Sequence, residues 1–244
     1  MVTILGVIPA RGASKSVPRK NIKPLAGVPL IAYSIREGLK SIHISRLVVS
    51  TEDEEIAAVA RQFGAEVPFM RPSELALDHT TDLPVFEHCL EWLKSQEGYV
   101  PEVVVQLRPT APLRRVEQID GAIDLLLRSP EAECVRSVCP AGQHPLKMWT
   151  CEGPWLRPFI PESVYGIHEA YNQPRQKLPK AYVQNGSIEV IRTSVITEQR
   201  SMTGRRIMAY PMDEIDSVNI DSPLDWALAE QLMLSRATGV QSAT

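Results

Sequence analysis

Residues 4–21 read ILGVIPARGASKSVPRKN, an apolar run that passes directly into a basic segment. The run at 4–8 is typical of a buried strand. The basic segment holds five cations within thirteen residues: Arg11, Lys15, Arg19, Lys20 and Lys23. Since the chain has 26 Lys and Arg among 244 residues, a window of that length should hold about 1.4 of them. The excess predicts a bound anion at the end of the strand, against the alternative of a solvated surface turn.

The overall composition is that of a globular protein without a broad basic surface. Hydrophobic residues make up 44% of the chain and charged residues 23%, and the net charge is -3. A nucleic-acid-binding domain would be more basic, so we expect no nucleic-acid partner. No apolar stretch approaches the ~20 residues that cross a bilayer, so we expect no membrane partner and a cytoplasmic location. The four cysteines form no C-x-x-C pair, which predicts reduced thiols.

Short apolar runs alternate with helical patterns over the first two thirds of the chain. Strands are predicted at residues 4–8, 47–50, 67–69, 103–107 and 134–138. Helices are predicted at 30–39, 54–63, 85–93 and 119–127, where apolar residues recur at spacings of three and four. The alternation predicts an α/β fold with a doubly wound, mostly parallel sheet of the Rossmann-like type. In such sheets ligands bind at the carboxyl ends of the strands.

The regular alternation weakens after residue 139, where prolines and aromatic residues become frequent. We interpret residues 140–182 as a lobe inserted into a single domain spanning residues 1–244, where it covers the active site or joins two subunits. Residues 185–192 and 205–212 then predict two further strands. Residues 223–234 predict a closing helix with Ser222 as its cap.

The segment after the first strand contains neither G-x-x-x-x-G-K-[ST] nor G-x-G-x-x-G, the two common phosphate-binding patterns. It offers instead cationic donors at Arg11 and Lys15, a hydroxyl at Ser14, and close backbone approach at Gly12 and Ala13. Together these groups can hold a polyphosphate through charge-assisted hydrogen bonds. A triphosphate fits the number of cations.

Further segments follow this one in a set order. They are RPSELALDHTTD (71–82), RPTAPLR (108–114), HPLK (144–147), QPRQKLPKAY (173–182), NGSIEVI (185–191) and DSVNIDSPLDWALAE (216–230). With residues 8–21, which are similar to A-R-G-G-S-K-G-[IVL]-P-x-K-N, they resemble the acylneuraminate cytidylyltransferases (CMP-sialic acid synthetases). Residues 71–82 resemble that family's R-P-x-E-L-A-x-D segment, and residues 108–114 resemble its Q-P-T-S-P-L-R segment. Residues 144–147 and 173–182 resemble its sugar-side loops, and the last two segments resemble its final strands and metal segment. The resemblance covers nearly the whole chain.

The resemblance implies a nucleotidyltransferase domain that binds CTP and a nine-carbon 2-keto acid sugar and forms a CMP-sugar and pyrophosphate. The nucleotide contacts that it implies are Arg11, Gly12, Ser14, Lys15 and Lys20 on the phosphates, Asn21 and Arg71 on the cytidine side, and Asp78 and Thr81 in the cytosine pocket. Backbone groups of residues 78–82 would line that pocket. Catalysis would rest on positioning and on neutralising the charge of the leaving pyrophosphate, for which Arg11 and Lys20 are the candidates.

The metal segment departs from the family pattern. Relatives usually have D-I-D, whereas this chain has Asn219, Ile220 and Asp221. On a strand, Asn219 and Asp221 would point to the same face. The resemblance implies Asp221 as the catalytic carboxylate that binds Mg²⁺, or Mn²⁺ in its place, and Asn219 as a ligand through its carbonyl oxygen. Because Asn219 carries no charge, we expect weaker cation binding, or compensation by Asp213 or Asp216. The alternative role for Asp221 is to cap the following helix.

The sugar side also departs from the family pattern. The resemblance implies sugar contacts at Arg108, Thr110, Lys147 and Arg175, the last two with a solvent-facing or subunit-contact role as the alternative. Arg108 stands where the family commonly has glutamine, and Val183 stands where an arginine often precedes the N-G pair. We therefore expect the substrate to be a nine-carbon ulosonic acid other than, or in addition to, N-acetylneuraminate.

Two other functions remain open at this level. A nucleotidyltransferase acting on a sugar 1-phosphate also begins with a strand and a basic glycine-containing loop, and it would depend on a phosphorylated sugar. A weakened nucleotide-binding homologue would have lost its metal through Asn219. The resemblance further implies a homodimer, in which the inserted lobe reaches the neighbour's site.

Overall fold

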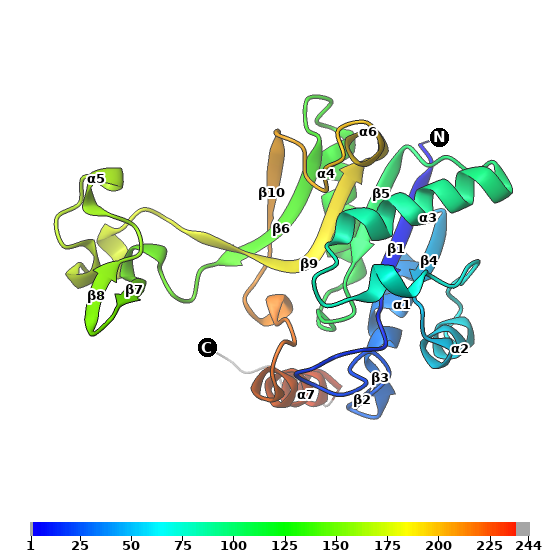
Figure 1. The fold of residues 1–244 in the computed structure, drawn as a ribbon, viewed down its shortest axis with the longest axis horizontal. Coiled ribbons are helices and arrows are strands. Elements are labelled where there is room, and N and C mark those ends of the chain that lie inside the picture. Colours follow the sequence, from blue (N-terminus) through cyan, green and yellow to red (C-terminus); the bar gives the residue numbers. More distant parts are fainter. Residues whose placement is uncertain (1, 238–244) are drawn as a thin grey trace.

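A six-stranded sheet forms the centre of the protein (Figure 1). The computed structural model describes residues 2–237, so the predicted domain of 1–244 extends beyond the described residues at both ends. The strands lie in the order β10 (Ile207–Pro211), β6 (Cys134–Pro140), β9 (Tyr182–Arg192), β5 (Val103–Leu107), β1 (Ile4–Pro9) and β4 (Arg46–Ser50). Only β9 in this sheet runs antiparallel to its neighbours. The mostly parallel sheet is confirmed.

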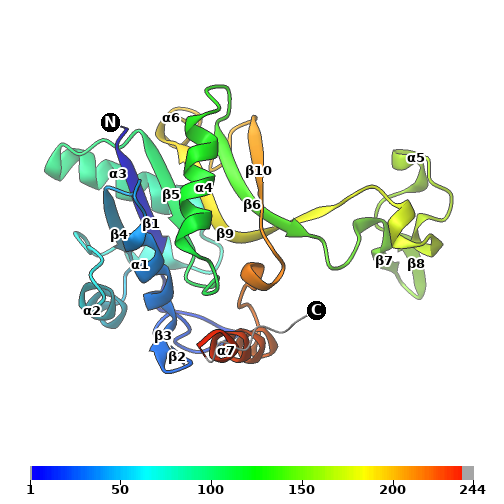
Figure 2. The ribbon, with the colours of Figure 1, turned by 180° about the vertical axis from the view of Figure 1, so that it is seen from behind.

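Helices cover both faces of the sheet. On one face lie α1 (Leu30–Lys40), α2 (Glu54–Gln62) and α4 (Val116–Leu127), which stand in front in Figure 2. On the other face lie α3 (Asp82–Glu97) and α6 (Thr193–Thr197). Each face has its own apolar cluster, centred on Ile31 and Ile119 on the first and on Phe86 and Val195 on the second. The doubly wound arrangement is therefore confirmed.

The strand order creates a crevice beside β1. This strand pairs with β4 on one side and with β5 on the other, both in parallel. The connections from β1 and from β5 leave the sheet at the same edge, because the carboxyl ends of parallel strands lie together. The basic segment follows β1, and the RPTAPLR segment follows β5. The two segments thus face each other across the crevice.

Most of the predicted elements are present, and the strands predicted from the apolar runs have one exception. Residues 67–69 form no strand. Glu66 makes a single bridge to Val48, with its backbone N–H donating to Leu47 and its carbonyl accepting from Val49. Pro68 has no N–H to continue the ladder, so pairing stops there.

Residues 141–181 project away from the sheet as an arm (Figures 1 and 2). The arm holds a small antiparallel pair, β7 (Trp149–Glu152) and β8 (Trp155–Pro158). It also holds α5 (Glu162–Tyr165) and the short 3-10 helices η2 (Pro145–Lys147), η3 (Ala170–Asn172) and η4 (Arg175–Lys177). Extended ends of β6 and β9 form its stem, where Cys139 pairs with Val183 and Pro140 with Tyr182.

The C-terminal elements pack against the hairpin that follows the basic segment. After η5 (Ile215–Ser217), helix α7 (Pro223–Ala237) packs near the hairpin of β2 (Pro24–Leu25) and β3 (Val28–Pro29). The predicted cap is confirmed: the Ser222 hydroxyl accepts from the backbone N–H of Asp225 at 3.2 Å, and the Asp225 carboxylate accepts from the Ser222 N–H at 2.7 Å. No helix among residues 2–237 is both long and apolar enough to span a membrane.

Candidate active site

A cleft of about 1040 Å³ opens at the carboxyl ends of β1 and β5. Its wall gathers residues from distant parts of the chain. Those already named from the sequence are Arg11, Ala13, Ser14, Lys15, Lys20, Asn21, Arg71, Asp78, Thr81, Arg108, Thr110, Val183, Asn219 and Asp221. A single cavity therefore brings together the residues expected for phosphate, cytidine, sugar and metal.

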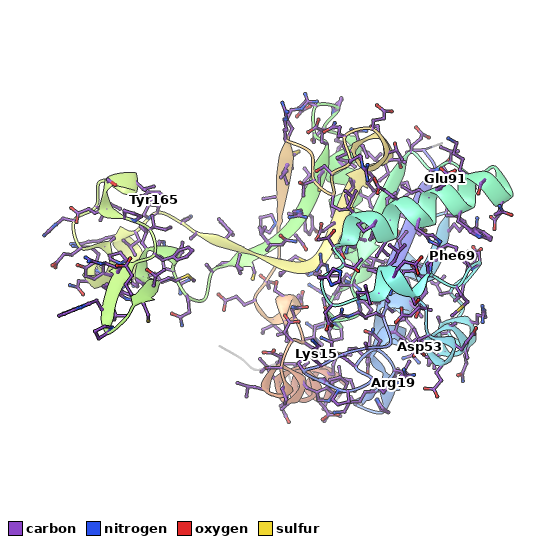
Figure 3. All side chains as sticks on the ribbon, in the orientation of Figure 1. Lys15, Arg19, Asp53, Phe69, Glu91 and Tyr165 are labelled. Atoms are coloured by element: carbon purple, nitrogen blue, oxygen red, sulfur yellow. The ribbon has the colours of Figure 1, made fainter. Side chains whose placement is uncertain are left out.

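The five cations of the basic segment do not all lie at one site. The prediction that they surround one anion is wrong for two of them, Arg19 and Lys23. Arg11, Lys15 and Lys20 line the cleft. Arg19 has a positive φ of 55° and turns away to pair with Asp53 and Glu55. Figure 3 shows Arg19 beside Asp53 and apart from Lys15. Lys23 lies over the ring of Trp226, with Nζ 4.6 Å from the centroid.

Local contacts hold the backbone of the basic segment. The N–H of Gly12 donates to Glu52 Oε1 at 2.7 Å, and a Cβ at this position would lie 2.5 Å from Asp53 Oδ2. Gly12 is therefore required for the turn, although it does not line the cleft. The buried side chain of Asn21 donates from Nδ2 to the carbonyl of Arg11 at 2.8 Å. This bond closes the turn around the cations.

Asp78 lies between two of the cations. Its carboxylate is 3.2 Å from the Arg11 guanidinium and also pairs with Lys15. Arg11 additionally donates to the carbonyl of Leu77 at 3.2 Å. The hydrogen bond from Lys15 is the main cause that lowers the pKa of Asp78. The carboxylate occupies the position that an anionic ligand of Arg11 and Lys15 would take.

Lys20 is the most enclosed of the three basic-segment cations that line the cleft, with 12% of its side chain exposed. Its ammonium donates to the carbonyl of Ile220 at 2.7 Å and lies 3.8 Å from Asp221 Oδ1. Burial lowers the pKa of Lys20, and the nearby Asp221 carboxylate opposes this effect in part. Lys20 thus connects the phosphate side to the metal segment.

The metal segment is a loop between η5 and α7, so the expected strand is wrong. Ile220 is buried and donates its N–H to the carbonyl of Thr110, which anchors the loop. Asn219 and Asp221 nevertheless lie together, since Nδ2 of Asn219 donates to Asp221. Asn219 Oδ1 is buried and has no hydrogen-bond partner among residues 2–237.

These two side chains fit a hard cation. Asp221 is largely exposed to the cleft and offers a carboxylate. Asn219 turns Nδ2 toward that carboxylate, so its buried, unpartnered Oδ1 would join the same ion after the amide rotates. Mg²⁺ is commonly held by one or two carboxylates together with substrate phosphates. No group of three or more His, Cys, Asp and Glu residues within 2–237 forms a cage. Asp216 is unsuited to compensate, because Arg115 and Arg236 bind it and it does not line the cleft; Asp213 also lies outside the lining.

The cytidine-side arginine is buried. Arg71 donates to Glu52 Oε2 at 2.7 Å, and only 3% of its side chain is exposed. Since the other oxygen of Glu52 binds Gly12, one carboxylate joins the basic segment to the cytidine side. The loop at 75–78, with Thr80 and Thr81, completes this part of the wall.

Arginines and carboxylates form the opposite end of the cleft. Arg108 binds Asp82 at 2.7 Å and lies 3.3 Å from Glu189. Arg136 binds Glu189 at 2.8 Å and also lines the cleft. Neither Arg136 nor Glu189 was expected at the site from the sequence. The available signal was the presence of charged residues within two predicted strands, 134–138 and 185–192.

Two predicted sugar contacts lie in the arm instead. Lys147 donates to the carbonyl of Tyr171 at 3.3 Å, and Arg175 donates to the carbonyls of Ala141 and Gly142. Neither residue lines the cleft of its own chain.

Comparisons with known proteins agree on one family. Residues 5–207 match the family model described as Cytidylyltransferase. The chain is 34% identical over 235 residues to the CMP-N,N'-diacetyllegionaminic acid synthase of Legionella pneumophila, covering 94% of this chain and 96% of that protein. It is 34% identical over 235 residues to the Campylobacter jejuni enzyme of the same name, covering 96% of each. The solved structure of CMP:2-keto-3-deoxy-manno-octonic acid synthetase complexed with CTP superimposes with a TM-score of 0.69 at 14% identity, covering 96% of this chain and 99% of that one.

Proposed function

The chain belongs to the cytidylyltransferase family, and from this premise we propose that it transfers CMP from CTP to the anomeric hydroxyl of a nine-carbon 2-keto-3-deoxy acid sugar. Pyrophosphate is the second product. The observation that carries the proposal is that one cleft joins three cations after β1 to an arginine pair at its other end. The first group suits a triphosphate, and the second suits an acidic acceptor.

The reaction needs alignment more than covalent chemistry from side chains. The anomeric oxygen forms a bond to the α-phosphorus and releases its proton to water, while the bond from that phosphorus to the pyrophosphate oxygen breaks. Arg11 and Lys20 hold the phosphates and neutralise the charge that develops on the leaving group. Lys15 and Ser14 bind the same phosphates from the outer side of the loop. The enclosure of Lys20 favours this role, because a buried charge is weakly screened by solvent.

A divalent cation would bind beside this group. We propose that Mg²⁺, replaceable by Mn²⁺, would be held by Asp221 and Asn219 together with phosphate oxygens of the nucleotide and water. When bound, the cation would supply further charge neutralisation on the phosphates. The unpartnered Oδ1 of Asn219 supports this assignment.

The identity of the sugar acceptor is inferred from two relatives and from two positions of the sequence. Two relatives at 34% identity are named for N,N'-diacetyllegionaminic acid, and Arg108 and Val183 depart from the residues common in sialic acid enzymes. We therefore propose an acceptor of the legionaminate or pseudaminate kind, in addition to or in place of N-acetylneuraminate. Pyrophosphate release with CTP should be measured across these free sugars. Efficient turnover of N-acetylneuraminate alone would contradict the choice of acceptor.

The same measurement tests the main alternative. The arginine pair would also suit a sugar 1-phosphate, whose phosphate is the nucleophile. Product from a free keto acid sugar with CTP supports cytidylyl transfer to a hydroxyl. Strict dependence on a phosphorylated sugar would replace that proposal with this one.

The arm suggests how the chain assembles. It exposes several large apolar side chains, including Trp155 at 71% and Phe159 at 59%, and Tyr165 lies on its outer part in Figure 3. Such residues on a projecting segment favour burial against another chain. We propose a homodimer that brings the arm, with Lys147 and Arg175, to the partner's cleft. Light scattering should give twice the chain mass of 27.2 kDa. Because the reaction consumes CTP, we assign it to the cytoplasm.

A further inference from the structure

The sugar end of the cleft is built on a row of polar side chains that crosses the sheet. Glu189 of β9 pairs in register with Gln106 of β5 and with Arg136 of β6. Residues directly opposite each other on neighbouring strands point to the same face. Glu189 and Gln106 are each 1% exposed. Burying a polar group costs free energy unless the group is hydrogen-bonded. The polar groups of this row must therefore form hydrogen bonds with one another or with a ligand.

Arg136 is held in a defined orientation. Its NH2 nitrogen donates to Glu189 Oε2 and its NH1 nitrogen to Gln184 Oε1, each at 2.8 Å. Gln184 in turn donates from Nε2 to Glu189 Oε1 at 2.9 Å. The guanidinium is thus fixed by two acceptors that also bind each other. A planar donor group fixed in this way is ready to bind a carboxylate.

The row still has unused donors. Nε of Arg136 and Nε of Arg108 are both buried and have no hydrogen-bond partner among residues 2–237. Both arginines line the cleft. Leaving these donors unpaired costs free energy. Because both Nε atoms are buried, a ligand carboxylate would satisfy them only after the guanidinium groups turn toward the cleft.

The two arginines differ in how fully their charge is balanced. The NH2 nitrogen of Arg108 lies between two carboxylates, Asp82 at 2.7 Å and Glu189 at 3.3 Å. Within residues 2–237, Arg136 pairs with one carboxylate, that of Glu189, which it shares with Arg108, and its NH1 nitrogen donates to the neutral amide of Gln184. Arg136 therefore retains the larger uncompensated positive charge.

The remaining cations of the cleft have other assignments. Three belong to the phosphate end, and Arg71 is paired with Glu52. Taking the proposed function as given, we propose that Arg136 binds the carboxylate of the acid sugar, with Arg108 beside it. Arg136 is then a residue that determines which sugar is accepted, and binding of the CMP group that is transferred does not depend on it.

The experiment compares an acid sugar with its own carboxamide, which keeps the shape and loses the charge. The ratio of the two kcat/KM values is measured for the wild type and for Arg136→Gln. Removal of a charge-assisted hydrogen bond should lower that ratio by between about 10- and 150-fold, while KM for CTP stays within about twofold. Arg128→Gln is the matched control, because Arg128 lies at the end of α4 outside the cleft; it should leave the ratio unchanged.

A purely structural role for Arg136 gives a different result. In that case Arg136→Gln reduces the rates with acid and amide equally, the ratio is unchanged, and the proposal is overturned. Failure of the wild type to use any free keto acid sugar instead overturns the proposed function. If Arg136→Gln does not bind CTP, the test uses the wild type with a non-hydrolysable CTP analogue bound and measures the modification of Arg136 by phenylglyoxal. Protection of Arg136 from phenylglyoxal by the acid sugar supports the proposal, and lack of protection overturns it.

Discussion

The carboxylate of Glu52 accepts a hydrogen bond of 2.7 Å from the backbone N–H of Gly12. Its second oxygen binds the guanidinium of Arg71, also at 2.7 Å. Glu52 follows β4, so a side chain from a neighbouring strand end joins the turn after β1 to Arg71. The position of the turn therefore depends on a residue that does not line the cleft.

Glu52→Gln should destabilise the protein. The change leaves the guanidinium of Arg71 buried without a counter-charge, and removing one partner of a buried ion pair costs about 3–5 kcal/mol. The free energy of unfolding, measured by urea denaturation, should fall by about that amount. Glu54→Gln, at an exposed position of α2, is the control. Equal losses in the two variants would show that the Arg71 pair contributes nothing.

Lys20 should set an alkaline limit to activity. Burial lowers the pKa of Lys20, so its charge is lost at a lower pH than for an exposed lysine, which titrates near pH 10.4. The protonated form binds phosphate; kcat/KM for CTP should therefore fall as pH rises through this pKa. Lys20→Arg keeps the charge and should move the alkaline limb to higher pH. An unchanged profile would mean that another group controls the limb.

Asp78→Asn should strengthen CTP binding. The Asp78 carboxylate pairs with Arg11 and Lys15, so it competes with the triphosphate for the same two cations. Because exposed ion pairs are weak, the dissociation constant measured by calorimetry should fall by only about 1.5- to 5-fold, and by less at high salt. Asp213→Asn is the control, since Asp213 lies outside the cleft. Weaker binding in Asp78→Asn would show that the carboxylate contacts the nucleotide directly.

Asn219→Asp should lower the Mg²⁺ concentration needed for half-maximal rate. A second carboxylate beside Asp221 adds one negative charge to the site, and a charge near a divalent ion changes affinity by roughly tenfold even in water. Rates are measured over a Mg²⁺ titration at saturating CTP. Gln231→Glu adds the same charge on α7, away from the cleft, and should change nothing. If the two titrations coincide, residue 219 is not a ligand.

The fold could be predicted well from the sequence, because its helices and strands follow local apolar patterns. Alternating apolar runs identified most strands and helices, and a charge excess located the loop after β1. The strand at 67–69 was predicted wrongly because a three-residue apolar run does not reveal whether a partner ladder continues, and Pro68 ends it. Local sequence patterns therefore predict most helices and strands correctly, but they predict short strands at the edge of a sheet less well.

The site was only partly predictable, because it depends on contacts between distant segments. Nothing near Arg19 indicated that Asp53 would take it out of the cleft, and nothing near Lys23 indicated Trp226. Arg136 and Glu189 are 53 residues apart and meet only through the register of β6 and β9. A charged residue within a predicted buried strand is the one sequence signal that would have suggested a search for its partner.

Strand β9 has a consequence for how such enzymes could be rebuilt. Its first residues belong to the stem of the arm, its next residues to the wall of the cleft, and its last residues to the core. A graft of residues 134–192 from a relative would move the arm together with Arg136 and Glu189 of the acceptor end, while Arg108 would remain that of this chain. Such a chimera should inherit the donor protein's choice of sugar while keeping this chain's demand for CTP, since the basic loop lies outside the exchanged piece.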